Sequence, residues 1–130
     1  MLAAIVEHAR RALPNEACGI VAGDRPWAEG GRPLRWIPLA NTHVSPFRYA
    51  IDPDALLALT IELDDRGEAI WAIVHSHPTS PAEPSPTDVR EAFYPEALQL
   101  IVSLMNATAG VRAWRVEGRL ATELSLARPA

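Results

Sequence analysis

The sequence predicts an α/β protein in which helices are interleaved with the strands of one β-sheet. Two stretches, residues 2–13 and 53–66, repeat apolar residues at the spacing of an amphipathic helix. Two others, residues 69–74 and 98–104, are almost wholly apolar, which is typical of central strands that are buried on both faces. The chain contains no internal repeat and no low-complexity linker, so we expect one domain over residues 1–130.

Short patterns predict the elements that precede the second helix. The first helix, residues 2–13, is expected to end before Pro14 and to carry one apolar stripe. Residues 18–22 form an apolar run that predicts a buried strand, and two further strands are expected at residues 34–39 and 47–51. The stripe of the first helix consists of Leu2, Ile5, Val6, Ala9 and Leu13.

The second helix has a strong start signal at Asp52-Pro53. An aspartate can cap a helix, and a proline at the first helical position gives up an amide that would have no partner there. Its apolar face, which includes Leu56, Leu59 and Leu63, continues until Gly67. At the carboxyl end of the chain, residues 111–116 and 120–126 are expected to form a closing hairpin around Glu117-Gly118.

Composition restricts the classes of partner. The chain is 48% hydrophobic and 22% charged, which is the balance of a soluble globular protein, and its longest apolar runs are far too short to cross a bilayer. A formal net charge of −4 with scattered arginines argues against nucleic acid as a partner. The single cysteine, Cys18, cannot form an internal disulfide, and the N-terminus lacks a basic leader. These features favour a cytoplasmic protein.

The segment His75-Ser76-His77 predicts a metal site. It follows the apolar run at residues 69–74, and the period of a strand projects both imidazoles from one face while Ser76 points to the other. Imidazole nitrogen and carboxylate oxygen suit zinc, and a catalytic zinc site has three protein ligands with a fourth position for water. Taken alone, a His-x-His pair is more often a coincidence of a surface or a core.

A third ligand is expected at Asp88. The prolines between residues 78 and 86 stiffen the intervening loop, and Ser85-Pro86 resembles a helix start that places Asp88 in the first turn. A loop returning over the strand end would bring Ser85 and Asp88 beside the histidines. A lone Ser-x-x-Asp is usually a helix cap, but a zinc site explains the two patterns together.

A metal-assisted hydrolysis also needs a proton acceptor, and the best carboxylate is Glu16. With it, the chain resembles the JAMM (MPN+) metalloprotease family, also called Mov34/MPN/PAD-1, over essentially its full length. The motif of that family is an upstream glutamate, then His-x-His, seven residues, a serine, two residues and an aspartate. The matching positions are Glu16, His75, His77, residues 78–84, Ser85 and Asp88.

The resemblance implies a mixed β-sheet flanked by helices, related in architecture to cytidine deaminases. We expect one zinc ion per chain on His75, His77 and Asp88, with Glu16 as general acid–base and Ser85 as donor to the developing oxyanion. The implied activity is hydrolysis of amide bonds at the Gly-Gly tail of ubiquitin-like or sulfur-carrier proteins. The segment after Asp88 is short, which favours a compact prokaryotic enzyme, and a homodimer is left open.

Other functions stay open at this point. A zinc deaminase needs His-x-Glu and a later Pro-Cys-x-x-Cys, which a chain with one cysteine lacks. Cys18 as a nucleophile is disfavoured because it lies in an apolar run that predicts a packed strand residue. A general metallopeptidase and a non-catalytic MPN scaffold are the remaining alternatives, and metal content with turnover of an amide substrate separates the scaffold from the enzyme.

Overall fold

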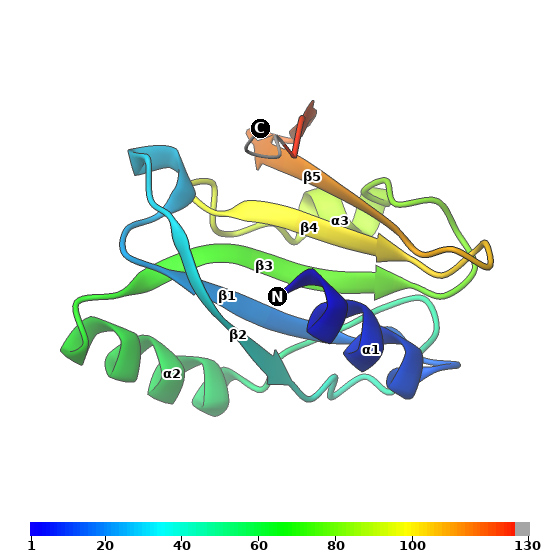
Figure 1. The fold of residues 1–130 in the computed structure, drawn as a ribbon, viewed down its shortest axis with the longest axis horizontal. Helices are drawn as coiled ribbons and strands as arrows, with labels where there is room; N and C mark the ends of the chain where they lie inside the picture. Colours follow the sequence, from blue (N-terminus) through cyan, green and yellow to red (C-terminus); the bar gives the residue numbers. More distant parts are fainter. Residues whose placement is uncertain (127–130) are drawn as a thin grey trace.

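The computed structural model describes residues 1–126, which fold around one mixed β-sheet (Figure 1). Its strands are β1 (Cys18–Gly23), β2 (Pro33–Leu39), β3 (Ala69–His77), β4 (Leu98–Ser103), β5 (Gly110–Glu117) and β6 (Leu120–Leu124). Their order across the six-stranded sheet is β2-β1-β3-β4-β5-β6. β3 and β4 are parallel, whereas the other neighbouring pairs are antiparallel. The predicted α/β class with a mixed sheet is confirmed.

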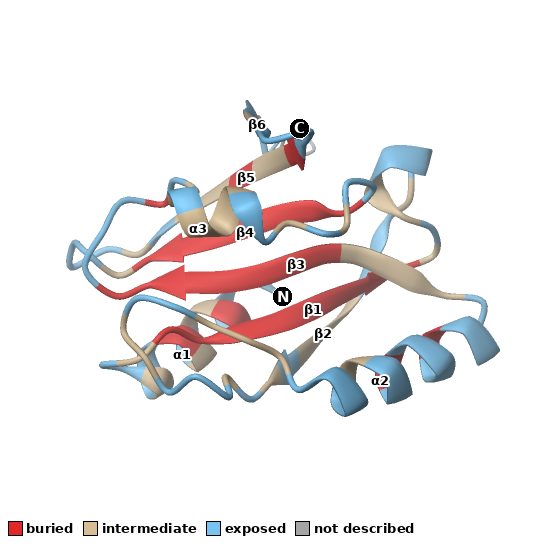
Figure 2. Ribbon diagram, turned by 180° about the vertical axis from the view of Figure 1, so that it is seen from behind, coloured by how far each residue is buried: buried red, intermediate tan, exposed pale blue. Residues whose placement is uncertain are grey.

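Helices cover both faces of the sheet. They are α1 (Leu2–Ala12), α2 (Pro53–Asp65) and α3 (Pro86–Arg90), with a short 3-10 helix, η1 (Trp27–Glu29), between β1 and β2. α1 lies on one face, and α3 lies on the other, as the front and rear views show (Figures 1 and 2). Over residues 1–126, every helix falls short of the length and apolar character that a membrane crossing requires.

α2 begins as its sequence predicts. The Asp52 carboxylate accepts a hydrogen bond from the Ala55 backbone N–H at 3.0 Å, and Pro53 occupies the first helical turn. The helix buries Leu59 and Leu63 against the sheet, and each fully buried leucine contributes roughly 1.5–3 kcal/mol of transfer free energy. Leu56 packs against the same core layer, so the expected apolar face of Leu56, Leu59 and Leu63 anchors α2.

In α1, fewer residues are buried against the sheet than the predicted apolar stripe contains. Ile5 and Ala9 are buried, but Leu2 and Leu13 at the two ends of the stripe remain about half exposed. The helix ends at Ala12 because Leu13 precedes Pro14 and adopts an extended conformation, with φ −51° and ψ 140°. Val6 and Ala12 pack against the same core layer, so residues 5–12 hold the helix on the sheet.

The core forms two layers, one on each side of the sheet, and the buried residues concentrate in β1, β3 and β4 (Figure 2). In β3, Ala72 and Val74 pack with α1 in one layer, whereas Ile73 packs with α2 in the other. Because side chains alternate along a strand, His75 and His77 project on the same side as Ile73. The face that carries α2 and α3 therefore also carries the predicted metal ligands.

The prediction of a strand at residues 47–51 is wrong. This stretch belongs to the loop between β2 and α2, which is organised by the side-chain amide of Asn41. The Asn41 Nδ2 atom donates to the carbonyls of Glu16 and Arg48, and its Oδ1 atom accepts from the backbone N–H groups of His43 and Ala50, all at 2.9–3.0 Å. The backbone groups that a strand would pair with a neighbour are bonded to this amide instead.

The closing hairpin is confirmed. β5 and β6 pair antiparallel, with Glu117 opposite Leu120 across the turn at Gly118. Gly118 has a φ of 58°, a left-handed conformation that glycine adopts without steric cost. The hairpin extends the sheet beyond β4 and places the side chains of β5 beside the loop that follows β3.

Candidate metal centre

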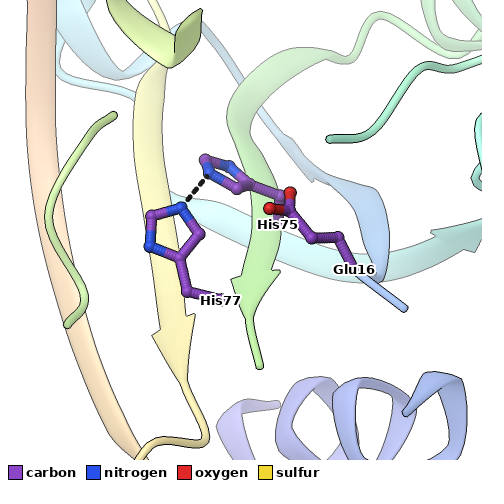
Figure 3. A group of neighbouring side chains, drawn as sticks. All are labelled: Glu16, His75 and His77. Carbon is purple, nitrogen blue, oxygen red and sulfur yellow. Dashed lines mark hydrogen bonds between the residues drawn. The ribbon is translucent and has the colours of Figure 1, made fainter. Parts of the chain in front are cut away.

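The two histidines predicted as ligands lie at the carboxyl end of β3. β1 runs antiparallel to β3 with Cys18 opposite His75, so the residues just before β1 lie beside the end of β3. The junction is tied by two hydrogen bonds: Ala17 N–H donates to Ser76 Oγ at 2.8 Å, and Ser76 N–H donates to the Ala17 carbonyl at 3.0 Å. Glu16 thereby reaches the histidines although it lies far from them in the sequence (Figure 3).

Asp88 reaches the same point from the first turn of α3. Ser85 caps this helix: its hydroxyl oxygen accepts from the Asp88 N–H at 3.0 Å, and its own N–H donates to Asp88 Oδ2 at 2.9 Å. This reciprocal capping box satisfies two amides that a helix start would otherwise leave without partners. It also fixes the direction of the Asp88 carboxylate, so the predicted helix start helps to position Asp88 beside the histidines.

Three side-chain atoms converge at the end of β3. His75 Nε2 and His77 Nε2 are 3.2 Å apart, and each lies 3.1 Å from Asp88 Oδ2. His75 and His77 are buried, and Asp88 is mostly so. The structure therefore brings together the three residues that the sequence singled out as a ligand set.

The chemistry of these three atoms fits a bound cation. His77 Nδ1 lies 2.8 Å from the Pro81 carbonyl, to which it can only donate, so a neutral His77 turns the lone pair of Nε2 towards Asp88. Zinc ligands lie about 2.0–2.2 Å from the ion, which separates two ligands of a tetrahedron by roughly 3.3 Å. The observed separations of 3.1–3.2 Å are close to that value. His75, His77 and Asp88 could thus hold one tetrahedral metal ion.

Glu16 is the fourth polar side chain of the cluster. One of its carboxylate oxygens lies within 4.8 Å of nitrogen atoms of both His75 and His77, whereas Asp88 Oδ2 lies at 3.1 Å from each. Burial raises the pKa of Glu16 to about 7, with His77 opposing the shift and Asp88 adding to it. Within the described residues, its Oε1 atom is buried without a hydrogen-bond partner. Glu16 is thus close enough to the histidines to share a metal ion with them, and its buried, unpartnered carboxyl oxygen also suits a proton carrier beside such an ion.

The backbone of Glu16 is held by the loop between β2 and α2. Glu16 N–H donates to the Ser45 carbonyl at 2.8 Å, and the Glu16 carbonyl accepts from Asn41 Nδ2 at 3.0 Å. The loop that was predicted to contain a strand therefore positions the carboxylate.

The two histidine rings are oriented by different contacts. His77 is fixed by the Pro81 carbonyl, the kind of outer contact that sets the tautomer of a ligating imidazole. The ring of His75 stacks on Tyr49 at 4.7 Å between centroids and 19° between planes. Its Nδ1 atom is buried without a partner in the described part of the chain. Stacking on Tyr49 thus takes the orienting role for His75.

The sequence did not predict the roles of Tyr49 and Pro81. Tyr49 fell within the erroneous strand, and a backbone carbonyl such as that of Pro81 carries no signature in side-chain patterns. The one available signal was the density of prolines after His77, which indicated a stiff loop but not its contacts.

Cys18 has the packed position that its surroundings predicted. Its side chain is 1% exposed, and burial, together with the nearby Glu16 carboxylate, raises the pKa of its thiol to about 12. A thiol with so high a pKa carries almost no thiolate near neutral pH, and thiolate is the nucleophilic form. The geometry therefore argues against a cysteine hydrolase.

Contacts with three neighbouring residues keep the Asp88 carboxylate anionic. Burial opposes ionisation of Asp88, but contacts with His75 and His77 and the Ser85 N–H outweigh it and hold the pKa of this carboxyl far below its usual value. An anionic oxygen next to two imidazole nitrogens is a strong cation ligand at neutral pH.

Comparison with known proteins places the chain in a family. Residues 1–117 match the family model described as prokaryotic homologs of the JAB domain. A relative from Mycobacterium tuberculosis, named CysO-cysteine peptidase, is 38% identical over 122 residues, which cover 92% of this chain and 81% of the relative. A relative from Thermus thermophilus, named "Probable TtuB-protein conjugate cleaving protease", is 40% identical over 108 residues, covering 82% of this chain and 66% of the relative.

A solved structure gives the same result at the level of fold. The solution structure of a protein from Desulfitobacterium hafniense superposes with a TM-score of 0.79 at 32% identity, covering 95% of this chain and 84% of that protein. The match of family model, relatives and fold confirms the resemblance that the Glu, His-x-His, Ser and Asp motif predicted. The chain belongs to the prokaryotic homologs of the JAB domain, within the JAMM/MPN family.

Proposed function

We propose that the chain is a zinc-dependent peptidase or isopeptidase that hydrolyses amide bonds at the C-terminal tail of ubiquitin-like or sulfur-carrier proteins. The observation that carries the proposal is the triangle of His75, His77 and Asp88 atoms at 3.1–3.2 Å with the buried Glu16 beside it. Two relatives named as a CysO-cysteine peptidase and a TtuB-conjugate cleaving protease support the substrate class.

In this proposal His75, His77 and Asp88 hold one zinc ion per chain. When bound, the ion polarises the scissile carbonyl and lowers the pKa of the attacking water. Glu16 takes the proton of that water and passes it to the leaving amine. Burial, which raises the pKa of Glu16 to about 7 in the metal-free chain, favours the protonated form of the carboxyl that this transfer needs. The Ser85 hydroxyl already accepts from the Asp88 N–H, so its own proton is free to be donated to the developing oxyanion.

The substrate is expected to present an extended, narrow tail that ends in Gly-Gly. His75 and His77 are 1% and 4% exposed, so a bulky chain has little room to approach their nitrogen atoms. Glycine lets the backbone approach such a site closely because it has no Cβ. The leaving group is either a single amino acid or a lysine side chain.

Incubation of the zinc-loaded protein with carrier conjugates tests the proposed substrate class. One set carries Gly-Gly before the scissile bond, and a matched set carries bulky residues there, with the products identified by mass spectrometry. We expect cleavage of the Gly-Gly set alone. Equal cleavage of both sets, or activity only on unrelated short peptides, would leave a general metallopeptidase. Stoichiometric zinc without turnover of any conjugate would favour the non-catalytic scaffold.

Replacing Ser85 with alanine is expected to lower kcat on the order of 10²–10³-fold, the usual cost of one oxyanion donor, while zinc content stays stoichiometric. The alanine also removes the cap of α3, which costs about 1 kcal/mol of stability. A Ser85→Thr variant keeps the hydroxyl and the cap and serves as control. A Ser85→Ala enzyme with the kcat of Ser85→Thr would show that the hydroxyl takes no part in turnover.

Zinc affinity is expected to weaken as the pH falls. In the metal-free chain, burial acts to lower the pKa of His77, but hydrogen bonds to Asp88 and the Pro81 carbonyl outweigh it and raise the pKa above its usual value. Protons therefore compete for the His77 nitrogen at a higher pH than for an ordinary imidazole. Below that pKa, the dissociation constant of zinc should rise about tenfold per pH unit. Chelator competition between about pH 5 and 8 measures the dissociation constant of zinc. A zinc affinity that does not change across this range would contradict His77 as a ligand.

A further inference from the structure

The loop at residues 78–85 determines how Asp88 meets the histidines, yet it has little structure of its own. It contains neither a helix nor a strand. Prolines at residues 78, 81 and 84 lack the N–H groups that would bond within it. Among its described residues, one internal backbone hydrogen bond is present, from Glu83 N–H to the Pro81 carbonyl at 2.8 Å. Contacts from outside must therefore define its path.

Three consecutive carbonyls of this loop each accept a hydrogen bond from a side chain of the sheet. Ser103 Oγ, at the end of β4, donates to the Ser80 carbonyl at 2.7 Å. His77 Nδ1 donates to the Pro81 carbonyl at 2.8 Å, and the indole N–H of Trp114 in β5 donates to the Ala82 carbonyl at 2.9 Å. The carbonyl that orients His77 is thus the middle one of three, and its two neighbours are fixed by other strands.

Trp114 is itself held in place. The guanidinium of Arg112, two residues earlier in β5, lies 5.0 Å from the centre of the Trp114 ring. Arg112 also bonds to the loop residue Glu83 at 3.0 Å and to Glu123 of β6 through two contacts of 2.7 Å. The loop residue next to Glu83, Ala82, is buried, so its carbonyl depends on the indole N–H for a partner. Trp114 is therefore a fixed donor to a buried acceptor.

We propose that Trp114 is a positioning residue of the candidate metal centre. Its indole N–H holds the Ala82 carbonyl in place. Because Pro81 is the preceding residue, this contact also positions the Pro81 carbonyl to accept the hydrogen bond from His77 Nδ1. This contact keeps the proton of His77 on Nδ1 and the lone pair of Nε2 directed at the ligand triangle. The inference rests on the metal centre of the proposed function, but not on the identity of the substrate.

The chain offers a matched pair of substitutions. Trp114→Phe keeps an aromatic ring beside Arg112 and removes the indole N–H together with the second ring of the indole. Trp71→Phe removes an equivalent donor, because Trp71 Nε1 donates to the Gly31 carbonyl at 2.7 Å, but Trp71 lies towards the opposite end of β3 from the histidines. Both variants lose one indole–carbonyl hydrogen bond, so a general loss of stability affects them alike.

Two readouts test the proposal, the dissociation constant of zinc by chelator competition and the exchange rate of the His77 Nδ1 proton by NMR, with and without zinc. We expect Trp114→Phe to weaken zinc binding on the order of 10-fold or more and to speed this proton exchange, with Trp71→Phe matching the wild type in both. Unchanged zinc affinity and proton exchange in Trp114→Phe, or equal losses in both variants, would overturn it.

The outcome can be separated from that of the proposed function. If the wild-type chain binds zinc but cleaves no carrier conjugate, a selective loss of zinc affinity in Trp114→Phe still supports the positioning role. If the wild-type chain binds no zinc, the proposed function fails. Proton exchange in the metal-free protein then decides alone whether Trp114 fixes His77.

Discussion

Replacement of Glu16 with glutamine is expected to abolish turnover of a carrier conjugate while leaving the fold and the zinc in place. Glutamine has the size of glutamate but neither accepts nor releases a proton near neutral pH. The buried carboxyl has a pKa raised to about 7, so it is the group of the cluster best matched to proton transfer at that pH. Loss of a positioned general acid–base costs typically 10²–10⁴-fold in rate, and we expect a loss at the upper end of that range.

The experiment compares kcat, zinc content and melting temperature for Glu16→Gln and for the control Glu7→Gln, an exposed glutamate of α1 that pairs with Arg11. The control should match the wild type in all three. If Glu16→Gln strips the zinc, the glutamate is a ligand and the roles assigned to Glu16 and Asp88 are wrong. Full turnover with bound zinc would show that the proton travels by another group.

Replacement of His77 with alanine is expected to remove the zinc and, with it, all turnover. Two remaining ligands, His75 and Asp88, would not complete a three-residue zinc site, and the Pro81 carbonyl would keep only the Glu83 N–H as a donor. Metal analysis of the purified variant after zinc supplementation measures the effect, which should be a stoichiometry near zero per chain.

Two further variants keep this result interpretable. His43→Ala removes an exposed histidine of the loop between β2 and α2 and should keep full zinc. Asp88→Asn removes the charge but preserves the size of the side chain, so it should lose zinc without a gross loss of fold. A His77→Ala or Asp88→Asn protein that retains one zinc per chain would contradict the assigned ligand set.

The sequence predicted the parts of the site whose residues lie within a few positions of one another. His75 and His77 are two apart at the end of an apolar run, and a strand with that pattern projects both rings on one face. Ser85 and Asp88 are three apart around a proline, which is the pattern of a capped helix start. Because each pattern is satisfied within a few residues, tertiary structure did not need to be known.

Residues 47–51 show why other parts could not be predicted. Phe47, Tyr49 and Ile51 alternate with polar or small residues, which imitates the period of a half-buried strand. In the structure Tyr49 and Ile51 do pack against the core, but Phe47 is 75% exposed and the backbone bonds to Asn41. The competing partner, a side-chain amide at the start of the same loop, has no periodic signature.

The contacts that orient the histidines could not be predicted from the sequence for a related reason. Tyr49 stacks on His75, and Trp114 bonds to Ala82, and both pairs join residues that are distant in the sequence. Such contacts follow from the strand order, which the sequence did not specify. The motif thus indicates which residues form the site, whereas the sheet topology decides which neighbours hold them.

We propose that His75, His77 and Asp88, and not Glu16, hold the metal. A crystal structure of the zinc-loaded protein, with the ion located by its anomalous scattering, tests this most directly. We expect one ion within about 2.0–2.2 Å of His75 Nε2, His77 Nε2 and Asp88 Oδ2, with the Glu16 carboxylate farther away. An ion bound by the Glu16 carboxylate in place of Asp88, or one located away from the two histidines, would contradict it.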